Sequence, residues 1–227
     1  MKRCVALGIC LLIMACGGGE VEQWKQANEK LNTENRSLKS SLSKAQRQID
    51  RAGEIGNRMV FLVQQIRNVK ARIVTNMGDV EVKFHPEKAP IHCFAFIARA
   101  ESGFYNNTKF HRVIKGFMIQ GGDPNSKDDD PSDDGGGGPL VHMPHEFNDI
   151  KHVPGILSTA RVPDVSAGAG SQFFIMHGIS PNLDNQYTVF GEVTGGMDVV
   201  NRIATVETVP GDRPAQPVII KRIDVFR

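Results

Sequence analysis

The spacing of apolar residues changes once along this chain, near Ala71. From Trp24 onward apolar residues recur at a seven-residue interval, whereas residues 79–85 alternate strictly between apolar and polar side chains. A seven-residue interval places side chains along one stripe of an α-helix, and alternation places them on one face of a β-strand. The sequence therefore predicts a helical segment, residues 20–70, followed by a β domain, residues 71–227.

The helical segment contains no proline and is rich in charged and amide residues. Asn28, Asn35 and Gly56 interrupt its apolar stripe, so two interpretations stay open. One is a coiled coil with a second copy of the chain, a possible homodimer through residues 20–70. The other is a single amphipathic helix whose more apolar end, residues 59–69, docks on the next domain. In both cases the helix is expected to act as a spacer. The two core positions of the repeat hold Trp24, Leu31, Leu38, Ala45, Ala52, Met59 and Ile66, and Asn28, Asn35, Leu42, Ile49, Gly56 and Val63.

The N-terminal residues predict export and lipid attachment. A short basic stretch precedes an apolar run, residues 5–15, which ends in a small residue just before Cys16. This run is shorter than the ~20 residues that span a bilayer as a helix, and it is typical of a cleaved signal peptide, residues 1–15. The junction resembles a bacterial lipobox. The resemblance implies a lipid on Cys16, residues 16–19 as a tether, and a bacterial cell-envelope location anchored to a membrane.

Cleavage before Cys16 would also affect the cysteine chemistry and the net charge. The mature chain would keep only Cys16 and Cys93, so no internal disulfide is expected. The full chain has 27 basic and 25 acidic residues, and loss of Lys2 and Arg3 leaves 25 of each. A chain without excess positive charge is not expected to bind nucleic acid. For the N-terminal segment, the alternatives to a lipoprotein signal are an ordinary signal peptide and an uncleaved short anchor.

The β domain is expected to form a closed or nearly closed antiparallel barrel. Residues 72–76 and 79–85 form a hairpin through the turn at Met77, Gly78 and Asp79. A helix begins at Pro90 and ends before Gly103. Many short apolar runs with few helices are typical of an antiparallel barrel. The helix is expected to bury Ile91, Phe94, Ala95 and Ala98, further strands are expected at 113–120, 173–176, 187–193 and 218–226, and a short helix at 197–203.

Three segments of this domain, residues 110–123, 170–175 and 183–191, place polar groups among large apolar ones. A guanidinium and two amides amid such side chains indicate an apolar pocket with hydrogen-bonding groups at its edge. We find no nucleophile with a base, no phosphate-binding loop and no paired carboxylates among these motifs. The polar groups are Arg112, Gln120 and Gln172, and the apolar ones Phe117, Met118, Phe174 and Leu183.

The sequences FHRVIKGFMIQGGD (110–123) and GSQFFI (170–175) resemble those of cyclophilins, the peptidyl-prolyl cis-trans isomerase family. The resemblance covers residues 71–227 and implies a mainly β fold, an eight-stranded antiparallel β-barrel capped by two helices, here preceded by a long N-terminal helix. It also implies that Arg112 is catalytic, that no cofactor is needed and that proline-containing peptide segments are the substrates. The implied substrate groove contains Phe117, Met118, Gln120, Ala160, Arg161, Gln172, Phe174, Asn182, Leu183 and Tyr187. The chain departs from common family residues at His92, Arg161, Asn182 and Tyr187.

The implied chemistry is the rotation of an Xaa-Pro amide. Amide resonance sets a barrier of about 18–20 kcal/mol to this rotation. A charged donor such as Arg112 can hydrogen-bond the prolyl nitrogen more strongly in the twisted amide than in the planar one, and Gln120 would orient Arg112 or the substrate. The alternative is a module that binds proline segments, with turnover incidental.

Other polar features are given structural interpretations. His142, His145, Glu146 and His152 could suggest a metal site, but Pro144 breaks helical ligand spacing, and a solvated loop is preferred. The aspartates of 123–134 do not fit a calcium loop and are expected to form a flexible acidic insertion. His111 is expected to be a packed or hydrogen-bonded histidine, and Cys93 a core residue.

Overall fold

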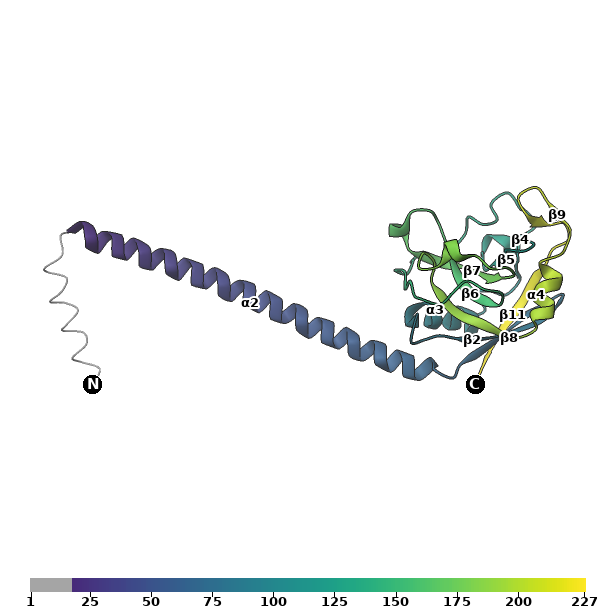
Figure 1. Ribbon diagram of the computed structural model, residues 1–227, viewed down its shortest axis with the longest axis horizontal. Helices are drawn as coiled ribbons and strands as arrows, with labels where there is room; N and C mark the ends of the chain where they lie inside the picture. Colours follow the sequence, from purple (N-terminus) through teal and green to yellow (C-terminus); the bar gives the residue numbers. More distant parts are fainter. Residues whose placement is uncertain (1–17) are drawn as a thin grey trace. The chain divides into compact units, whose positions relative to one another are not determined.

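The computed structural model describes residues 18–227 in two compact units, one ending at Arg58 and one comprising Met59–Arg227. The predicted signal peptide, residues 1–15, and Cys16 lie outside the described residues. The first unit consists of helix α2, Gly18–Ile66, 49 residues long, whose C-terminal turns belong to the second unit (Figure 1). At about 1.5 Å per residue this helix is ~74 Å long. No helix among residues 18–227 has the length and apolarity needed to cross a membrane.

The end of α2 joins the core of the second unit. Ile66 and Val69 are both buried there, whereas the side chains of residues 22–58 are exposed. The hypothesis that the apolar end, residues 59–69, docks on the β domain is therefore supported at these two positions.

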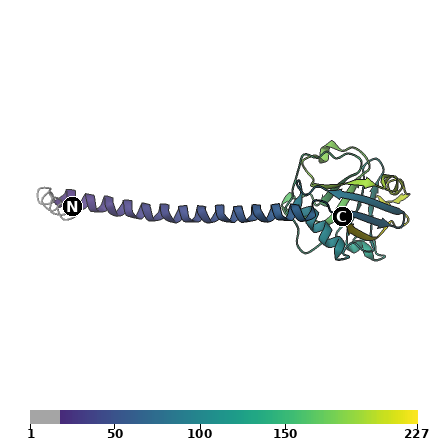
Figure 2. The same ribbon diagram turned by 90° about the horizontal axis from the view of Figure 1, so that it is seen from below.

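The second unit is built on one antiparallel sheet of nine strands, in the order β3-β11-β1-β2-β8-β6-β7-β5-β4, which curls around the apolar core (Figure 2). A second sheet pairs β9 with β10. The mainly β antiparallel fold is confirmed, and the sheet has one strand more than the eight expected because the two-residue β3 pairs with β11. The strands are β1 Lys70–Thr75, β2 Gly78–Phe84, β3 Thr108–Lys109, β4 Arg112–Ile114, β5 Met118–Gly121, β6 Ile156–Arg161, β7 Ala169–Met176, β8 Val189–Gly195, β9 Thr208–Val209, β10 Arg213–Pro214 and β11 Ile219–Phe226.

The predicted hairpin is present as β1 and β2. Ile73 pairs with Val80, and Val80 and Val82 are fully buried, as the alternation indicated. The strands join through Asn76 and Met77, so the turn lies slightly before the predicted position. Three short 3-10 helices complete the unit: η1 Asn125–Lys127, η2 Val165–Ala167 and η3 Pro181–Leu183.

Two helices contact the sheet, α3 (Pro90–Glu101) and α4 (Met197–Ile203), and both were predicted. The expected buried face of α3 was wrong, because Phe94 is 49% exposed. The buried residues are His92, Cys93, Phe96, Ile97 and Ala100. His92 can be buried because Glu146 pairs with its Nδ1 at 2.6 Å and accepts the backbone N–H groups of Ile91 and His92. A carboxylate from a distant loop thus caps this helix.

The core contains a cluster of aromatic rings around Phe96, whose centroid lies 5.1 to 5.6 Å from four others. A second, smaller apolar cluster lies on the other side of β7. Successive residues of a strand point to opposite faces, so Phe173 enters the first cluster and Phe174 the second. The rings around Phe96 are those of Phe84, Tyr105, Phe173 and Phe190.

Candidate active site

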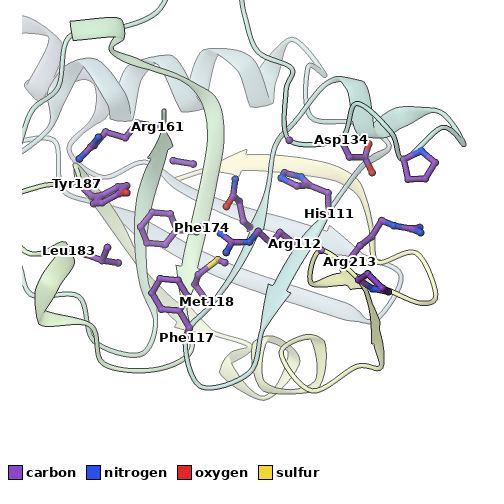
Figure 3. Close-up of a pocket in the computed structure, with 16 residues that line it drawn as sticks. His111, Arg112, Phe117, Met118, Asp134, Arg161, Phe174, Leu183, Tyr187 and Arg213 are labelled. Carbon is purple, nitrogen blue, oxygen red and sulfur yellow. The ribbon is translucent and has the colours of Figure 1, made fainter. Parts of the chain in front are cut away.

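A groove of about 510 Å³ lies over the second apolar cluster (Figure 3). Its walls come from strands β4, β5, β6 and β7, from η3, and from the loops before β6 and β10. It collects most of the predicted site residues from segments far apart in the sequence. The groove is lined by His111, Arg112, Phe117, Met118, Gln120, Pro131, Asp134, Gly135, Ala160, Arg161, Phe174, Leu183, Tyr187, Pro210, Gly211 and Arg213.

The apolar part of the groove forms a socket of buried and partly buried side chains. Met118 and Phe174 come from adjacent strands, because Met118 pairs with Met176 and Gln120 with Phe174. Leu183 is supplied by η3, and the Tyr187 ring meets Phe174 edge-on at 5.8 Å. Phe117 is fixed by its carbonyl, which accepts the N–H groups of His177 and Gly178. This socket therefore combines apolar side chains from β5, β7 and η3 and from the segments beside them.

Arg112 lies beside this socket on the short strand β4, opposite Gln120 on β5. Figure 3 shows its side chain extending toward Met118. Its Nε donates a hydrogen bond to Asp212 Oδ2 at 3.3 Å, and the Asp212 carbonyl accepts the Val113 N–H at 2.7 Å. Asp212 therefore holds both the side chain and the strand of Arg112.

Among the described residues, Gln120 forms no hydrogen bond with Arg112 and is engaged by Gln172 instead. Its Nε2 donates to Gln172 Oε1 at 2.9 Å, and Gln172 Nε2 donates to the carbonyls of Gly135 and Gly137. The two amides thus connect the groove to the insertion 123–138. Gln172 itself lines an adjoining cavity of about 380 Å³, which shares Gln120, Gly135, Ala160 and Arg161 with the groove.

At the groove edge, Arg161 lines the groove as predicted and Asn182 does not. The Arg161 guanidinium lies 4.6 Å from the Tyr187 ring, and it donates to the carbonyls of Gln186, Val162 and Pro163. Asn182 is exposed and does not line the groove, because it is the neighbouring Leu183 of η3 that points inward. Ala160 and Tyr187 lie in the groove wall as predicted.

Three residues in or beside the groove were not predicted from sequence: Asp134 and Arg213 line it, and Asp212 holds Arg112. Asp212 is 100 positions from Arg112 and adopts a positive φ of 60° in the β9–β10 turn. The Pro210-Gly211-Asp212 sequence indicates a tight turn, but no local pattern indicates that this turn meets β4.

The acidic insertion is ordered by Asp123, which was expected to belong to a flexible segment. Asp123 is fully buried, and its carboxylate accepts the backbone N–H groups of Asn125, Gly135 and Gly137. Hydrogen bonds to a buried carboxylate are charge-assisted and strong. The insertion is therefore anchored at both ends by one side chain.

Replacement of Asp123 by alanine should release this loop. We expect the domain to lose about 2 kcal/mol of stability, since hydrogen bonds to charged groups contribute about 1.5–3 kcal/mol, and residues 128–138 to become much more sensitive to protease. Limited proteolysis and denaturant unfolding measure both effects. Asp129→Ala is the matched control, because Asp129 is exposed. Equal cleavage of the two variants would contradict the anchoring role.

His111 is a packed histidine at the groove, as predicted. It is buried, and within the described residues neither ring nitrogen has a hydrogen-bond partner. Burial lowers its pKa, nearby Arg112 adds to this, and Asp123 opposes it. In the unfolded chain the histidine pKa is about 6.5. The neutral ring is therefore favoured by folding.

This shift predicts a loss of stability in acid. Below about pH 6.5 the unfolded chain binds the proton more readily than the folded one, so the free energy of unfolding falls as the pH falls. In His111→Leu, the free energy of unfolding should decrease less between about pH 7.5 and pH 5 than in the wild type. Denaturant unfolding across this range measures the slope. The exposed His142 serves as control, and an unchanged slope in His111→Leu would contradict the prediction.

The four residues that could suggest a metal have separate partners. Glu146 binds the start of α3, and His142 contacts the Ala167 carbonyl at 2.8 Å. His145 stacks on Phe147, and His152 pairs with Asp184 at 3.1 Å. Burial lowers the pKa of His152, although Asp184 opposes the shift. Among residues 18–227, no group of three His, Cys, Asp or Glu side chains is arranged to hold a metal ion. Cys93 is fully buried, as expected.

Comparison with known proteins identifies relatives of the β domain. The profile of the family described as "Cyclophilin type peptidyl-prolyl cis-trans isomerase/CLD" matches residues 70–225. Peptidyl-prolyl cis-trans isomerase-like 2 of Rhizopus delemar is 40% identical over 170 residues, which is 73% of this chain and 31% of that protein. Peptidyl-prolyl cis-trans isomerase CYP18-1 of Arabidopsis thaliana is 38% identical over 158 residues, 66% of this chain and 92% of that protein. Like the Rhizopus delemar protein, three other relatives are much longer, and the chain spans 23% to 33% of their length.

Solved structures give the same result. A cyclophilin type peptidyl-prolyl cis-trans isomerase of Cryptosporidium parvum, crystallised in the presence of the dipeptide Ala-Pro, has a TM-score of 0.64 and 34% identity. The match covers 70% of this chain and 99% of that one. The profile match, the relatives and the shared fold agree, and we conclude that the chain belongs to the cyclophilin type peptidyl-prolyl cis-trans isomerase family.

Proposed function

We propose that this chain catalyses cis–trans isomerisation of Xaa-Pro bonds in peptide segments of exported proteins. The observation that carries the proposal is the position of Arg112 beside the apolar socket of Phe117, Met118, Phe174 and Leu183. The socket would hold a pyrrolidine ring, and the guanidinium beside it would donate to the prolyl nitrogen of a ring bound there. The presence of Ala-Pro in the crystals of the Cryptosporidium parvum relative supports the same class of ligand.

The geometry accounts for catalysis without a base or a nucleophile. Rotation about the amide removes resonance, and the prolyl nitrogen then becomes a better hydrogen-bond acceptor. Arg112 stays charged at any physiological pH. Asp212 holds Nε, and among the described residues no hydrogen bond engages the two terminal nitrogens of Arg112. Those nitrogens can bind the twisted amide more strongly than the planar one, which lowers the barrier.

The socket and the amides of Gln120 and Gln172 would contact different parts of the substrate. Phe117, Phe174 and Leu183 would hold the proline ring while the preceding carbonyl rotates. The ring would keep its apolar contacts during this rotation, because the carbonyl moves and the ring does not. Gln120 is held by Gln172, which fixes its position in the groove wall near Arg112. We assign Gln120 and Ala160 to contacts with the substrate backbone.

Exchange spectroscopy on an Xaa-Pro peptide with substoichiometric full chain tests this function. Catalysis predicts exchange cross-peaks between the cis and trans forms within seconds, whereas the uncatalysed process takes tens of seconds or longer. Shift changes in the peptide without faster exchange would overturn the proposal and indicate a module that only binds proline segments.

We also propose that the protein is anchored to a membrane of the bacterial envelope by a lipid on Cys16. Support comes from the sequence, where the apolar run 5–15 ends next to this cysteine. Helix α2 would act as the spacer, since its 49 residues extend about 74 Å at 1.5 Å per residue.

Replacement of Cys16 by alanine should abolish lipid labelling and move the protein from the membrane to the soluble fraction. A single lipid-bearing residue is the proposed anchor, so its loss removes the apolar area that holds the chain at the bilayer. Metabolic labelling with a fatty acid and fractionation measure both effects, with Cys10→Ala as control. Membrane retention of Cys16→Ala would show an uncleaved anchor instead.

A further inference from the structure

Helix α2 carries a regular stripe of exposed apolar side chains, which we call the seam. Its large members, Trp24, Leu31, Leu38, Leu42 and Ile49, are each 56% to 71% exposed. Between residues 22 and 54 every Trp, Leu and Ile of the helix belongs to the seam. The outer face carries charged residues instead, so the helix is amphipathic with its apolar side open.

The spacing of the seam is that of a two-stranded coiled coil. With Asn28 and Asn35 included, the positions of the seam lie alternately four and three residues apart from Trp24 to Ala52. This is about four heptads, a length that indicates a coiled coil. With Leu31 and Leu38 at d positions, Leu42 and Ile49 occupy a positions. We propose that a second copy of this chain covers the seam in a parallel, in-register coiled coil.

The asparagines favour that occupant and that orientation. Asn28 and Asn35 lie at a positions, where buried asparagine specifies register and oligomeric state. In a parallel in-register pair each asparagine faces its own counterpart, and the two amides can hydrogen-bond. In an antiparallel pair a positions face d positions, and every d residue from Trp24 to Ala52 is apolar. Asn28 and Asn35 would then be buried without partners, which is unfavourable.

The charges beside the seam fit the same arrangement. A parallel pair brings a g residue close to the e residue five positions later on the other chain. Glu34 is at g and Lys39 at e, and both are exposed. The neighbouring pairs, Ala27 with Asn32 and Ser41 with Gln46, are uncharged. Two copies thus form two opposite-charge pairs with no like-charge contact in this stretch.

Cross-linking of the full chain tests the proposal. We expect Leu38→Cys to form a dimer with a short bis-maleimide, several-fold more than Arg47→Cys, whose side chain lies on the outer face. The wild type reports any reaction of native cysteines. Equal cross-linking of the two variants would overturn the pairing.

Two further measurements fix orientation and energetic role. Parallel pairing predicts that Trp24→Cys links to itself and not to Ala52→Cys in a mixture of tagged chains. A product joining positions 24 and 52 would overturn the parallel register.

The double variant Leu31→Ala and Leu42→Ala keeps helix propensity and should sediment as a monomer where the wild type is a dimer. Wild type that remains monomeric, or that sediments only with a different protein, would overturn the second-copy assignment.

Discussion

Arg112→Ala should lower kcat/KM for an Xaa-Pro peptide by about 30- to 150-fold, because a hydrogen bond from a charged donor contributes about 2–3 kcal/mol. In the proposed mechanism that hydrogen bond forms fully only in the twisted amide, so the loss should appear in kcat more than in KM. Exchange spectroscopy at several peptide concentrations separates the two constants. The socket of Phe117, Phe174 and Leu183 is untouched, and peptide binding should persist.

Arg161 provides the matched control, since it is a second guanidinium in the same groove. Its donors are already engaged by the carbonyls of Gln186, Val162 and Pro163. Arg161→Ala should therefore change kcat far less than Arg112→Ala. Equal losses in the two variants would indicate a general effect of positive charge, and no loss in Arg112→Ala would contradict the mechanism.

Phe96→Ala should destabilise the β domain by about 3–5 kcal/mol, the usual cost of removing a buried phenylalanine ring. Phe96 is 3% exposed and contacts four aromatic rings at the centre of the core. Denaturant unfolding followed by near-ultraviolet circular dichroism of Tyr105 and Tyr187 measures the loss. Tryptophan fluorescence does not report on this domain, because the only tryptophan is Trp24 in α2.

Phe94→Ala is the control on the same helix. Phe94 is 49% exposed. Phe94→Ala should therefore lower the free energy of unfolding much less than Phe96→Ala does. Phe96→Leu retains most of the volume and should lose only about 1.5 kcal/mol, which keeps the comparison possible if Phe96→Ala does not fold. A larger loss for Phe94→Ala than for Phe96→Leu would contradict the buried face seen in the structure.

Helix α3 shows why apolar spacing alone did not identify that face. Ile91 and Phe94 are spaced for one face and Cys93, Phe96 and Ile97 for another, so the periodicity fits both. His92 decides between them. Its burial depends on Glu146, 54 positions away, and the sequence gives no sign of that contact.

Some of the strands and the apolar part of the groove were predictable because their signals are local. The prediction of one strand at 113–120 was wrong, because this run forms the hairpin β4–β5, and β6 was not predicted. Alternation in 79–85 gave β2 with its buried face, and adjacent Phe173 and Phe174 supply the core and the groove from one strand. The motif containing Arg112 folds as the hairpin β4–β5 and supplies Phe117 and Met118 of the socket. The other socket residues, Phe174 and Leu183, come from β7 and η3. Patterns of this kind depend on neighbouring residues and not on contacts between distant parts of the chain, so they can be interpreted from the sequence.

The contacts that orient the polar groups were not predictable, because they join loops distant in sequence. Asp212 reaches Arg112 from the β9–β10 turn, and Asp123 orders an insertion that composition alone indicated to be flexible. Asn182 was assigned to the groove by resemblance, but the turn of η3 directs Leu183 inward instead. Each outcome depends on tertiary geometry that residue spacing does not contain.

If isomerisation takes place in the groove beside Arg112, the methyl group of Met118 should report on it directly. Met118 is 2% exposed and forms part of the socket. With carbon-13-labelled methionine methyl groups, assigned through Met118→Leu, we expect exchange at Met118 during turnover at the rate of peptide isomerisation. The same peptide with alanine in place of proline should produce no exchange. Accelerated isomerisation without any response at Met118 would show that the reaction does not take place in this groove.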